Sequence, residues 1–157
     1  MCRIPLSHDP KIFPKEGQFS FMTKPVTQRI GNIALLVENY DDAIAFYTSQ
    51  LQFTLVEDID IGDGKRWVQV SPPNCLGTNL VLTQATTDAE KQAVGNQAGG
   101  LVLMLLQTND FWRDHKQMKA NGVIFEEEPR VEPYGTVAIF QDLYGNRWDL
   151  IEPASDF

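Results

Sequence analysis

A chain of 157 residues with 43% hydrophobic residues is long enough for one domain, or for two small fused halves, and can form a core. The formal net charge is −8, and residues 1–26 carry a balance of +2, so the rest of the chain is near −10. A surface this acidic repels phosphate backbones and anionic lipids, which argues against nucleic acid and membrane partners.

The N-terminal residues predict a tail outside the fold. Residues 1–26 contain several prolines and scattered phenylalanines but no apolar stretch typical of a secretory signal, and no part of the chain is apolar for long enough to cross a bilayer. We therefore expect a cytoplasmic protein. Cys2 in the tail and Cys75 in a Pro/Gly-rich loop indicate reduced thiols rather than a structural disulfide.

The first half of the chain predicts the order β-α-β-β-β. Apolar, alternating or β-branched segments predict four strands, at 30–37, 53–59, 66–71 and 79–84. Between the first two strands, Asn39 is a candidate helix cap, with carboxylates in the following turn. Ala43, Phe46, Tyr47 and Leu51 then recur at helical spacing and give this helix one apolar side.

The second half predicts the same order of elements. A capping box from Thr87 to Glu90, ended by Gly95, predicts a short connecting helix. We expect strands at 101–107 and 123–127, a helix at 109–121 and a closing hairpin of 136–141 and 147–152. Asn79 and Asp149 occupy matching places 70 residues apart, so the halves resemble an ancient duplication. The expected organisation is a tail (1–26), a first module (27–84), a linker with the short helix (85–99) and a second module (100–157).

Two such modules predict an α+β fold in which the strands form an incomplete eight-stranded barrel with helices outside and a small-molecule cavity inside. Strand side chains alternate between faces. On this basis we expect Asn32, Asn79 and Asp149 to face the cavity, whereas Trp148 packs under a helix. The same alternation places three residues of the first strand under the first helix: Ile33, Leu35 and Val37.

The segments IGNIALLVENYDDAIAFYTSQLQF (30–53) and DLYGNRWDLIEP (142–153) resemble the vicinal oxygen chelate superfamily, which contains glyoxalase I, bleomycin-resistance proteins and extradiol dioxygenases. The resemblance covers residues 28–153 and implies the glyoxalase/bleomycin-resistance-like fold. Members of this size usually pair, so it also implies a homodimer. The scaffold hosts isomerases, lyases, dioxygenases and non-catalytic drug binders, so it does not by itself select a reaction.

The resemblance also implies where a metal would bind. Metal-using members take ligands from four strand positions, which fall here at Asn32, Asn79, the 100–102 window and Asp149. Only Asp149 is a good ligand, because an amide oxygen is a poor substitute for imidazole and the window has no donor side chain. We therefore predict no cofactor and no metal ligands, with a divalent ion as the alternative. His115 shares the packed stripe of its helix, which favours a half-buried residue over a ligand.

Three residues are candidates for polar contacts in the cavity. Asp149 is the candidate catalytic residue, as a general base or a ligand anchor; the alternative is an ion pair with Arg147, two residues away on the same face. Asn32 and Asn79 are candidate ligand contacts, because buried amides on neighbouring strands need hydrogen-bond partners.

Three further residues are candidate ligand-binding groups. Arg66 could reach an anionic substrate, although a surface ion pair with Asp60 or Asp63 is the alternative. Trp67 and Tyr134 could stack on a ligand, although Tyr134 also fits a role in closing the loop before the hairpin.

The sequence thus predicts a glyoxalase-like small-molecule-binding protein without the usual metal centre. Two alternatives remain open. One is a metal-dependent lyase or isomerase of the glyoxalase I type, or a dioxygenase; the other is a non-catalytic, drug-sequestering binder of the bleomycin-resistance type. Whether the protein is an enzyme is left undecided by the residues.

Overall fold

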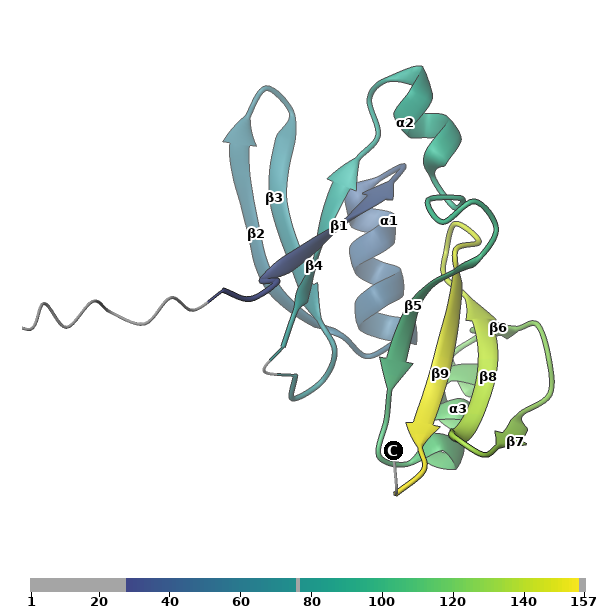
Figure 1. Cartoon of the computed structure of the whole chain (residues 1–157). Helices are drawn as coiled ribbons and strands as arrows, with labels where there is room; N and C mark the ends of the chain where they lie inside the picture. Colours follow the sequence, from purple (N-terminus) through teal and green to yellow (C-terminus); the bar gives the residue numbers. More distant parts are fainter. Residues whose placement is uncertain (1–27, 76, 156–157) are drawn as a thin grey trace, which may run out of the picture.

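The computed structural model describes residues 28–75 and 77–155. The tail predicted for residues 1–26 lies outside the described residues. The chain folds into two small sheets, each with a helix on one face (Figure 1).

The first sheet has four strands in the order β1-β4-β3-β2. Its strands are β1 (Asn32–Val37), β2 (Thr54–Gly62), β3 (Lys65–Ser71) and β4 (Asn79–Gln84). β1 runs parallel to β4, and the other neighbours are antiparallel. Between β1 and β2 lie α1 (Tyr40–Ala45) and a π-helical turn, η1 (Phe46–Gln50), which continues it.

The second sheet repeats this order as β5-β9-β8-β6. Its strands are β5 (Val102–Gln107), β6 (Ile124–Phe125), β8 (Gly135–Gln141) and β9 (Arg147–Pro153), with the short β7 (Arg130–Glu132) paired to β8. The helix α3 (Phe111–Ala120) lies between β5 and β6. The matching strand orders support the duplication, and the α+β fold is confirmed. The two sheets are not hydrogen-bonded to each other among the described residues, so the barrel is not closed.

The core lies between each sheet and its helix. Asn39 caps α1 by accepting from the backbone N–H groups of Asp41 and Asp42, as its sequence position predicted. In the first sheet the buried face comprises Leu35, Val37, Val68, Val70, Leu80 and Leu82. Trp148 packs under the helices as predicted, and its exposed fraction is 3%. Ile33 differs from its prediction because it lies near the start of β1 and remains 40% exposed.

The two modules meet at a buried polar contact. Tyr47 of η1 is fully buried and donates its hydroxyl hydrogen to Asp142 Oδ2 at 2.9 Å. Asp142 lies in the β8–β9 turn, where it also accepts from the backbone N–H groups of Tyr144 and Asn146 and from the Asn146 amide. The Tyr47 ring lies 6.3 Å from that of Trp148. This contact joins the first helix to the hairpin of the other module.

The connector between the modules contains α2 (Asp88–Ala93). The predicted capping box is present, since Thr87 accepts from Glu90 N and the Glu90 carboxylate accepts from Thr87 N. Further along, Gln97 hydrogen-bonds both Leu36 N and Ala34 O on the free edge of β1. The connector therefore protects the edge of β1, which pairs with β4 alone among the described strands. None of the described helices is long and apolar enough to cross a membrane.

Candidate functional site on the open face of the sheets

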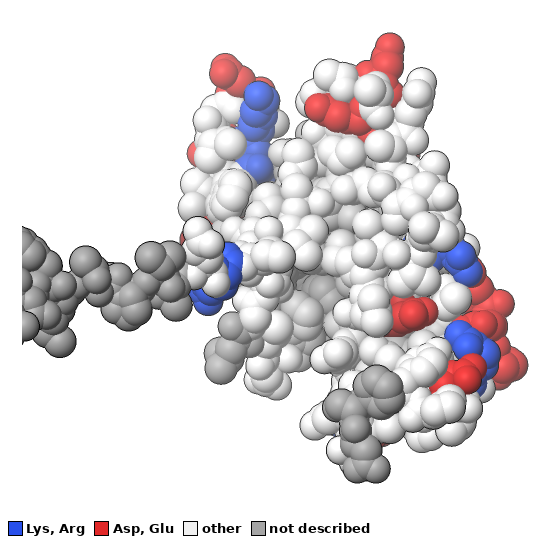
Figure 2. Space-filling view, in the orientation of Figure 1, with Lys and Arg blue, Asp and Glu red and all other residues white. Residues whose placement is uncertain are grey.

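Each sheet has one face that its helix leaves uncovered, and we call these two surfaces the open face. In Figure 1, α1 and α3 lie behind their sheets, so the view looks onto the open face. The same view in Figure 2 is mostly free of charged side chains, and most of the charges gather at the β2–β3 turn, at α2 and along the edge of the second sheet. This surface is where a ligand could contact several strands at once.

A hydrogen-bonded chain of side chains crosses the open face of the first sheet. Glu57 Oε2 accepts from Trp67 Nε1 at 2.8 Å and from Gln69 Nε2 at 2.7 Å. Gln69 Oε1 in turn accepts from Asn79 Nδ2 at 3.1 Å. The chain therefore joins β2, β3 and β4, and we call these four residues the open-face network.

A β-bulge decides that Glu57 belongs to this network. Leu55 pairs with Val70, whose side chain lies on the helix side, and strict alternation would place Glu57 on that side too. The register shifts between Leu55 and Glu57, so Glu57 pairs with Gln69 instead. Sequence reasoning missed Glu57 for this reason. The position of Gln69 could be predicted from the sequence, because strand alternation places it on the same face as Trp67.

Asn32 and Asn79 are brought together, as the sequence suggested. They are register partners at the start of the parallel β1–β4 pair. Asn79 is half-buried and belongs to the open-face network, whereas Asn32 is exposed at the edge of the sheet. The two amides thus present one polar end of the first sheet to solvent.

Asp149 lies on the open face of the second sheet, between Leu105 and Ile139 in register. Its Oδ1 is buried and has no hydrogen-bond partner among the described residues. Burial raises the pKa of the Asp149 carboxyl, and the negative charge of Glu127 adds to this rise, while Arg130 and Arg147 oppose it. The alternative pairing with Arg147 is not found, because Arg147 forms its ion pair with Glu126 at 2.9 Å.

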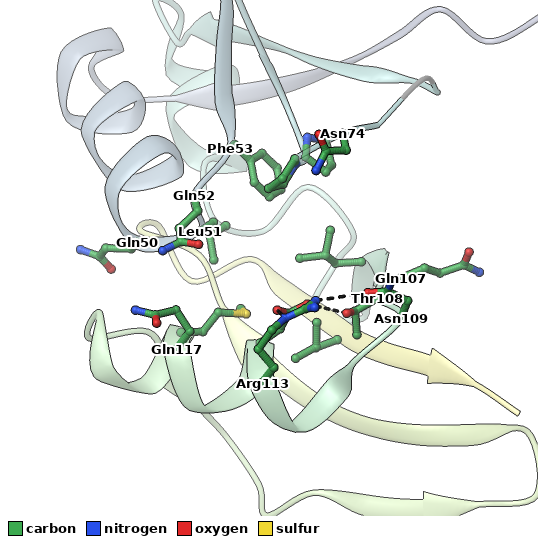
Figure 3. Close-up of a pocket in the computed structure, with 16 residues that line it drawn as sticks. Gln50, Leu51, Gln52, Phe53, Asn74, Gln107, Thr108, Asn109, Arg113 and Gln117 are labelled. Carbon is green, nitrogen blue, oxygen red and sulfur yellow. Dashed lines mark hydrogen bonds and ion pairs between the residues drawn. The ribbon is translucent and has the colours of Figure 1, made fainter.

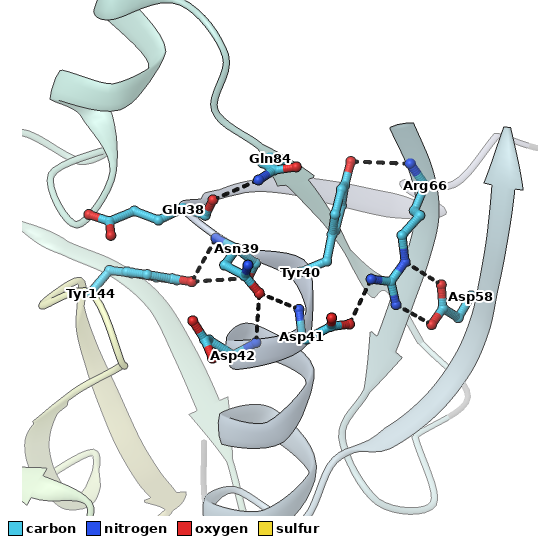
Figure 4. A network of polar contacts seen from close by, with 9 residues as sticks. All are labelled: Glu38, Asn39, Tyr40, Asp41, Asp42, Asp58, Arg66, Gln84 and Tyr144. Carbon is cyan, nitrogen blue, oxygen red and sulfur yellow. Dashed lines mark hydrogen bonds and ion pairs between the residues drawn. The ribbon is translucent and has the colours of Figure 1, made fainter. Parts of the chain in front are cut away.

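Arg66 lies on the helix side of β3 and is not part of the open face (Figure 4). Its guanidinium pairs with Asp58 at 2.5 Å and with Asp41 at 2.6 Å, and it lies 5.2 Å from the centre of the Tyr40 ring. The hydrogen bond from Arg66 lowers the pKa of Asp58. An ion pair was the expected alternative, but its partners differ from the two predicted, Asp60 and Asp63.

Tyr134 and His115 also lie apart from the open-face network. Tyr134 is 40% exposed in the turn before β8, where its carbonyl accepts from Ala154 N. His115 is buried in α3, with its ring 5.5 Å from Phe111 and 4.4 Å from Phe125. Burial lowers the pKa of His115, which fits a neutral packed imidazole. The prediction of a packed helix residue is confirmed.

The residues at the expected metal positions do not fit a transition-metal ion. The register places Leu105 beside Asp149, whereas Val102, in the predicted window, pairs with Arg147. Neither gives a donor side chain, and Asn32 and Asn79 offer only amides, so Asp149 is the sole strong ligand of the set. Among residues 28–75 and 77–155, no three His, Cys, Asp or Glu side chains converge as a metal site would require.

Residues 29–150 match the sequence profile of the Glyoxalase/Bleomycin resistance protein/Dioxygenase superfamily. A protein from Shewanella frigidimarina is 48% identical over 126 residues, which are 80% of this chain and 93% of that protein. YurT of Bacillus subtilis is 31% identical over 76% of this chain and 94% of its own length.

Two solved structures extend the comparison. The crystal structure of UcmS2 covers 81% of this chain and 99% of its own, with a TM-score of 0.72 and 27% identity. That of TnmS3, an antibiotic binding protein from Streptomyces sp. CB03234, covers 83% and 99%, with a TM-score of 0.67 and 28% identity.

Proposed function

Because this chain belongs to the Glyoxalase/Bleomycin resistance protein/Dioxygenase superfamily, we propose that it binds and sequesters a small organic molecule on the open face of its sheets. The observation that carries the proposal is the open-face network, which aligns polar groups from three strands beside an exposed indole. This polar chain lies on the face away from the helix core, where Gln69 is buried and Trp67 remains partly exposed. It is well placed to recognise a ligand.

The network defines the kind of ligand. Trp67 is 36% exposed, so its ring can stack on a planar group. Glu57 Oε1 receives no hydrogen bond from a described residue, which leaves one carboxylate oxygen free to accept from a ligand. We therefore expect a planar molecule that carries hydroxyl or N–H donors. The likeness to TnmS3, an antibiotic binding protein, supports this class of ligand.

Binding is tested by titration with doxorubicin, a planar aromatic antibiotic with several hydroxyl groups, followed through tryptophan fluorescence. We expect saturable quenching. Trp67→Leu removes the stacking partner and should weaken affinity about tenfold, and Glu57→Gln should weaken it by a similar factor. Trp112→Leu is the matched control, because Trp112 is exposed on α3, away from the open face, and should leave the affinity unchanged. Equal affinities for Trp67→Leu and Trp112→Leu would reject the open face as the site.

A proton-transfer enzyme of the glyoxalase type is the second candidate, favoured by Asp149. Its raised pKa, and an Oδ1 without a hydrogen-bond partner in the described part of the chain, are properties of a general base near a reacting carbonyl. Mass spectrometry of a small molecule that co-purifies with the protein separates the two candidates. If the protein only binds the molecule, its mass and retention time stay unchanged. If the protein is an enzyme, an isomer or a fragment is detected, and its yield falls in Asp149→Asn.

We propose that this function needs no resident metal, since the donor set at the expected positions is too weak. Elemental analysis of the purified protein is the direct test. Metal content well below one ion per chain is expected both for the native protein and for Asp149→Ala. One tightly held nickel, zinc or iron ion per chain, lost in Asp149→Ala, would contradict this part of the proposal.

We propose that a second copy of the chain completes the cavity. The open face exposes large apolar side chains on both sheets, among them Ile59 (51%) on β2 and Leu105 (60%) on β5. A homodimer would bury these side chains and enclose the open-face network. Light scattering during size exclusion should give twice the chain mass of 17.7 kDa, and Leu105→Lys should shift the population to single chains. A native protein that stays monomeric at high concentration would contradict the dimer.

A further inference from the structure

A recess lies on the helix side of the molecule, between the end of η1 and α3 (Figure 3). Its volume is about 550 Å³, which falls within the range of small-molecule pockets. The first module supplies one wall through residues 50–53 and 72–74, and the second supplies the other through the end of β5 and α3. Leu106 and Leu150 lie at its base, on the helix side of the second sheet, so this recess is separate from the open face. We call it the amide cleft.

The polar lining of the amide cleft consists mainly of carboxamides. Six side chains of this type line it: Gln50, Gln52, Asn74, Gln107, Asn109 and Gln117. In Figure 3, Gln52, two residues past the end of η1, points into the space between the two walls. Among the residues that the structure describes, the side chains of Gln52 and Asn74 form no hydrogen bond, whereas Gln117 donates to Asn121 Oδ1 at 2.9 Å. Each carboxamide offers both donors and an acceptor, so a ligand that also donates and accepts can satisfy several of them together.

The two charged side chains among the described residues that line the cleft, Arg113 and Asp114, form an ion pair with each other. Arg113 donates to Asp114 Oδ1 at 2.7 Å, and Thr108 donates to the other oxygen of Asp114. Burial alone would raise the pKa of Asp114, but the hydrogen bonds from Arg113 and Thr108 hold it below its ordinary value. Both partners thus stay ionised and paired. An anionic or cationic ligand would find no unpaired opposite charge here.

Two residues of the cleft have a backbone conformation that costs stability. Gln52 has φ 58° and Asn74 has φ 54°, a left-handed region that glycine adopts with the least strain. Gln52 follows Leu51, the C-cap of η1, at the position where helices most often end in glycine. Gln52 thus keeps its side chain over the cleft although glycine would relieve the backbone. Such strained positions concentrate at functional sites.

We propose that the amide cleft binds an uncharged, polyhydroxylated small molecule such as a sugar or a polyol. Hydroxyl groups donate and accept as carboxamides do, and a neutral molecule matches the paired charges of the cleft. A peptide strand would need a line of backbone partners along one edge, whereas these carboxamides come from separate segments on opposing walls. The proposal is independent of the open face and of its ligand.

The test is an NMR titration that follows the side-chain NH₂ signals of the full chain. The probes are glucose, sucrose and myo-inositol, with glucose 6-phosphate and glucuronate as charged comparators. Saturable shifts of the Gln52, Asn74 and Gln117 signals with a neutral probe are expected. Gln52→Gly and Asn74→Gly should each weaken affinity about three- to tenfold, which corresponds to one lost hydrogen bond. Both should keep or raise the melting temperature, because glycine relieves the left-handed backbone.

Asp63→Gly is the matched control. Asp63 has φ 53° in the β2–β3 turn, so glycine gives the same relief there without altering the cleft. It should raise thermal stability and leave sugar affinity unchanged. The proposal is overturned if no neutral probe gives saturable shifts, if the charged sugars bind more tightly than the neutral ones, or if Gln52→Gly and Asn74→Gly bind as tightly as Asp63→Gly.

Discussion

Replacing Tyr47 with phenylalanine removes the hydroxyl that links the two modules and keeps the aromatic ring. The ring still packs against Phe46, Phe53 and Trp148. The substitution therefore isolates the 2.9 Å hydrogen bond to Asp142. Burial raises the pKa of Tyr47 well above its ordinary value, so the hydroxyl remains protonated over the neutral pH range and the effect should not depend on pH there.

The expected loss follows from the burial of both partners. A hydrogen bond to a charged group contributes about 1.5–3 kcal/mol, and Asp142 Oδ2 keeps its bond from Asn146 Nδ2 after the substitution. We therefore expect the free energy of unfolding to fall by about 2 kcal/mol. For a chain of this size this corresponds to a melting temperature lower by about 4–8 °C.

Denaturant unfolding with circular dichroism measures this loss, and Tyr40→Phe is the control. Among the residues that the structure describes, the Tyr40 hydroxyl accepts from Arg66 N alone, at the long distance of 3.4 Å, so its removal should cost less than about 0.5 kcal/mol. The ring beside Arg66 remains in that variant. Equal losses for Tyr47→Phe and Tyr40→Phe would refute the reasoning, because the junction bond would then contribute no more than a marginal surface contact.

Three further outcomes are expected. Gly95→Ala should destabilise the fold by more than about 2 kcal/mol, because its Cβ would lie 2.0 Å from Tyr144 O; Gly99→Ala, with a left-handed backbone but open space, should cost only about 1 kcal/mol when thermal melts are compared. Asn39→Ala should lower the free energy of unfolding by about 1 kcal/mol through loss of the α1 cap, and a cost near zero would mean that water replaces it. Burial raises the pKa of Asp149, so its ionisation costs stability as the pH rises above the ordinary value of 3.8. In denaturant titrations Asp149→Asn should therefore be more stable than the native chain at neutral pH, and this difference should vanish near pH 3.8. A difference in stability that grows toward acidic pH would contradict the assigned direction of the pKa shift.

Local pattern was enough to predict most of the elements and the packed side of each strand. The capping box at Thr87 and the cap at Asn39 depend on contacts within four residues, so their sequence spacing predicts them. Alternation placed Leu35 and Trp148 under the helices for the same reason. The short β7 and the π-helical turn η1 were not predicted; β7 pairs with β8 from a distant part of the chain, and Tyr47 of η1 packs against Trp148 of the other module.

The sequence by itself thus determined which side chains could form a polar surface, through residue type and the two-residue period of a strand. The tertiary structure decided which of them meet. The β-bulge adds one residue to β2 and so places Glu57 on the open face, beside Trp67 and Gln69. Alternation counted from the start of β2 would instead place Glu57 on the helix side. Arg66 forms its ion pairs with Asp41 and Asp58, which the fold brings next to it. The coulombic energy of an ion pair depends on distance and local dielectric, and not on separation along the chain.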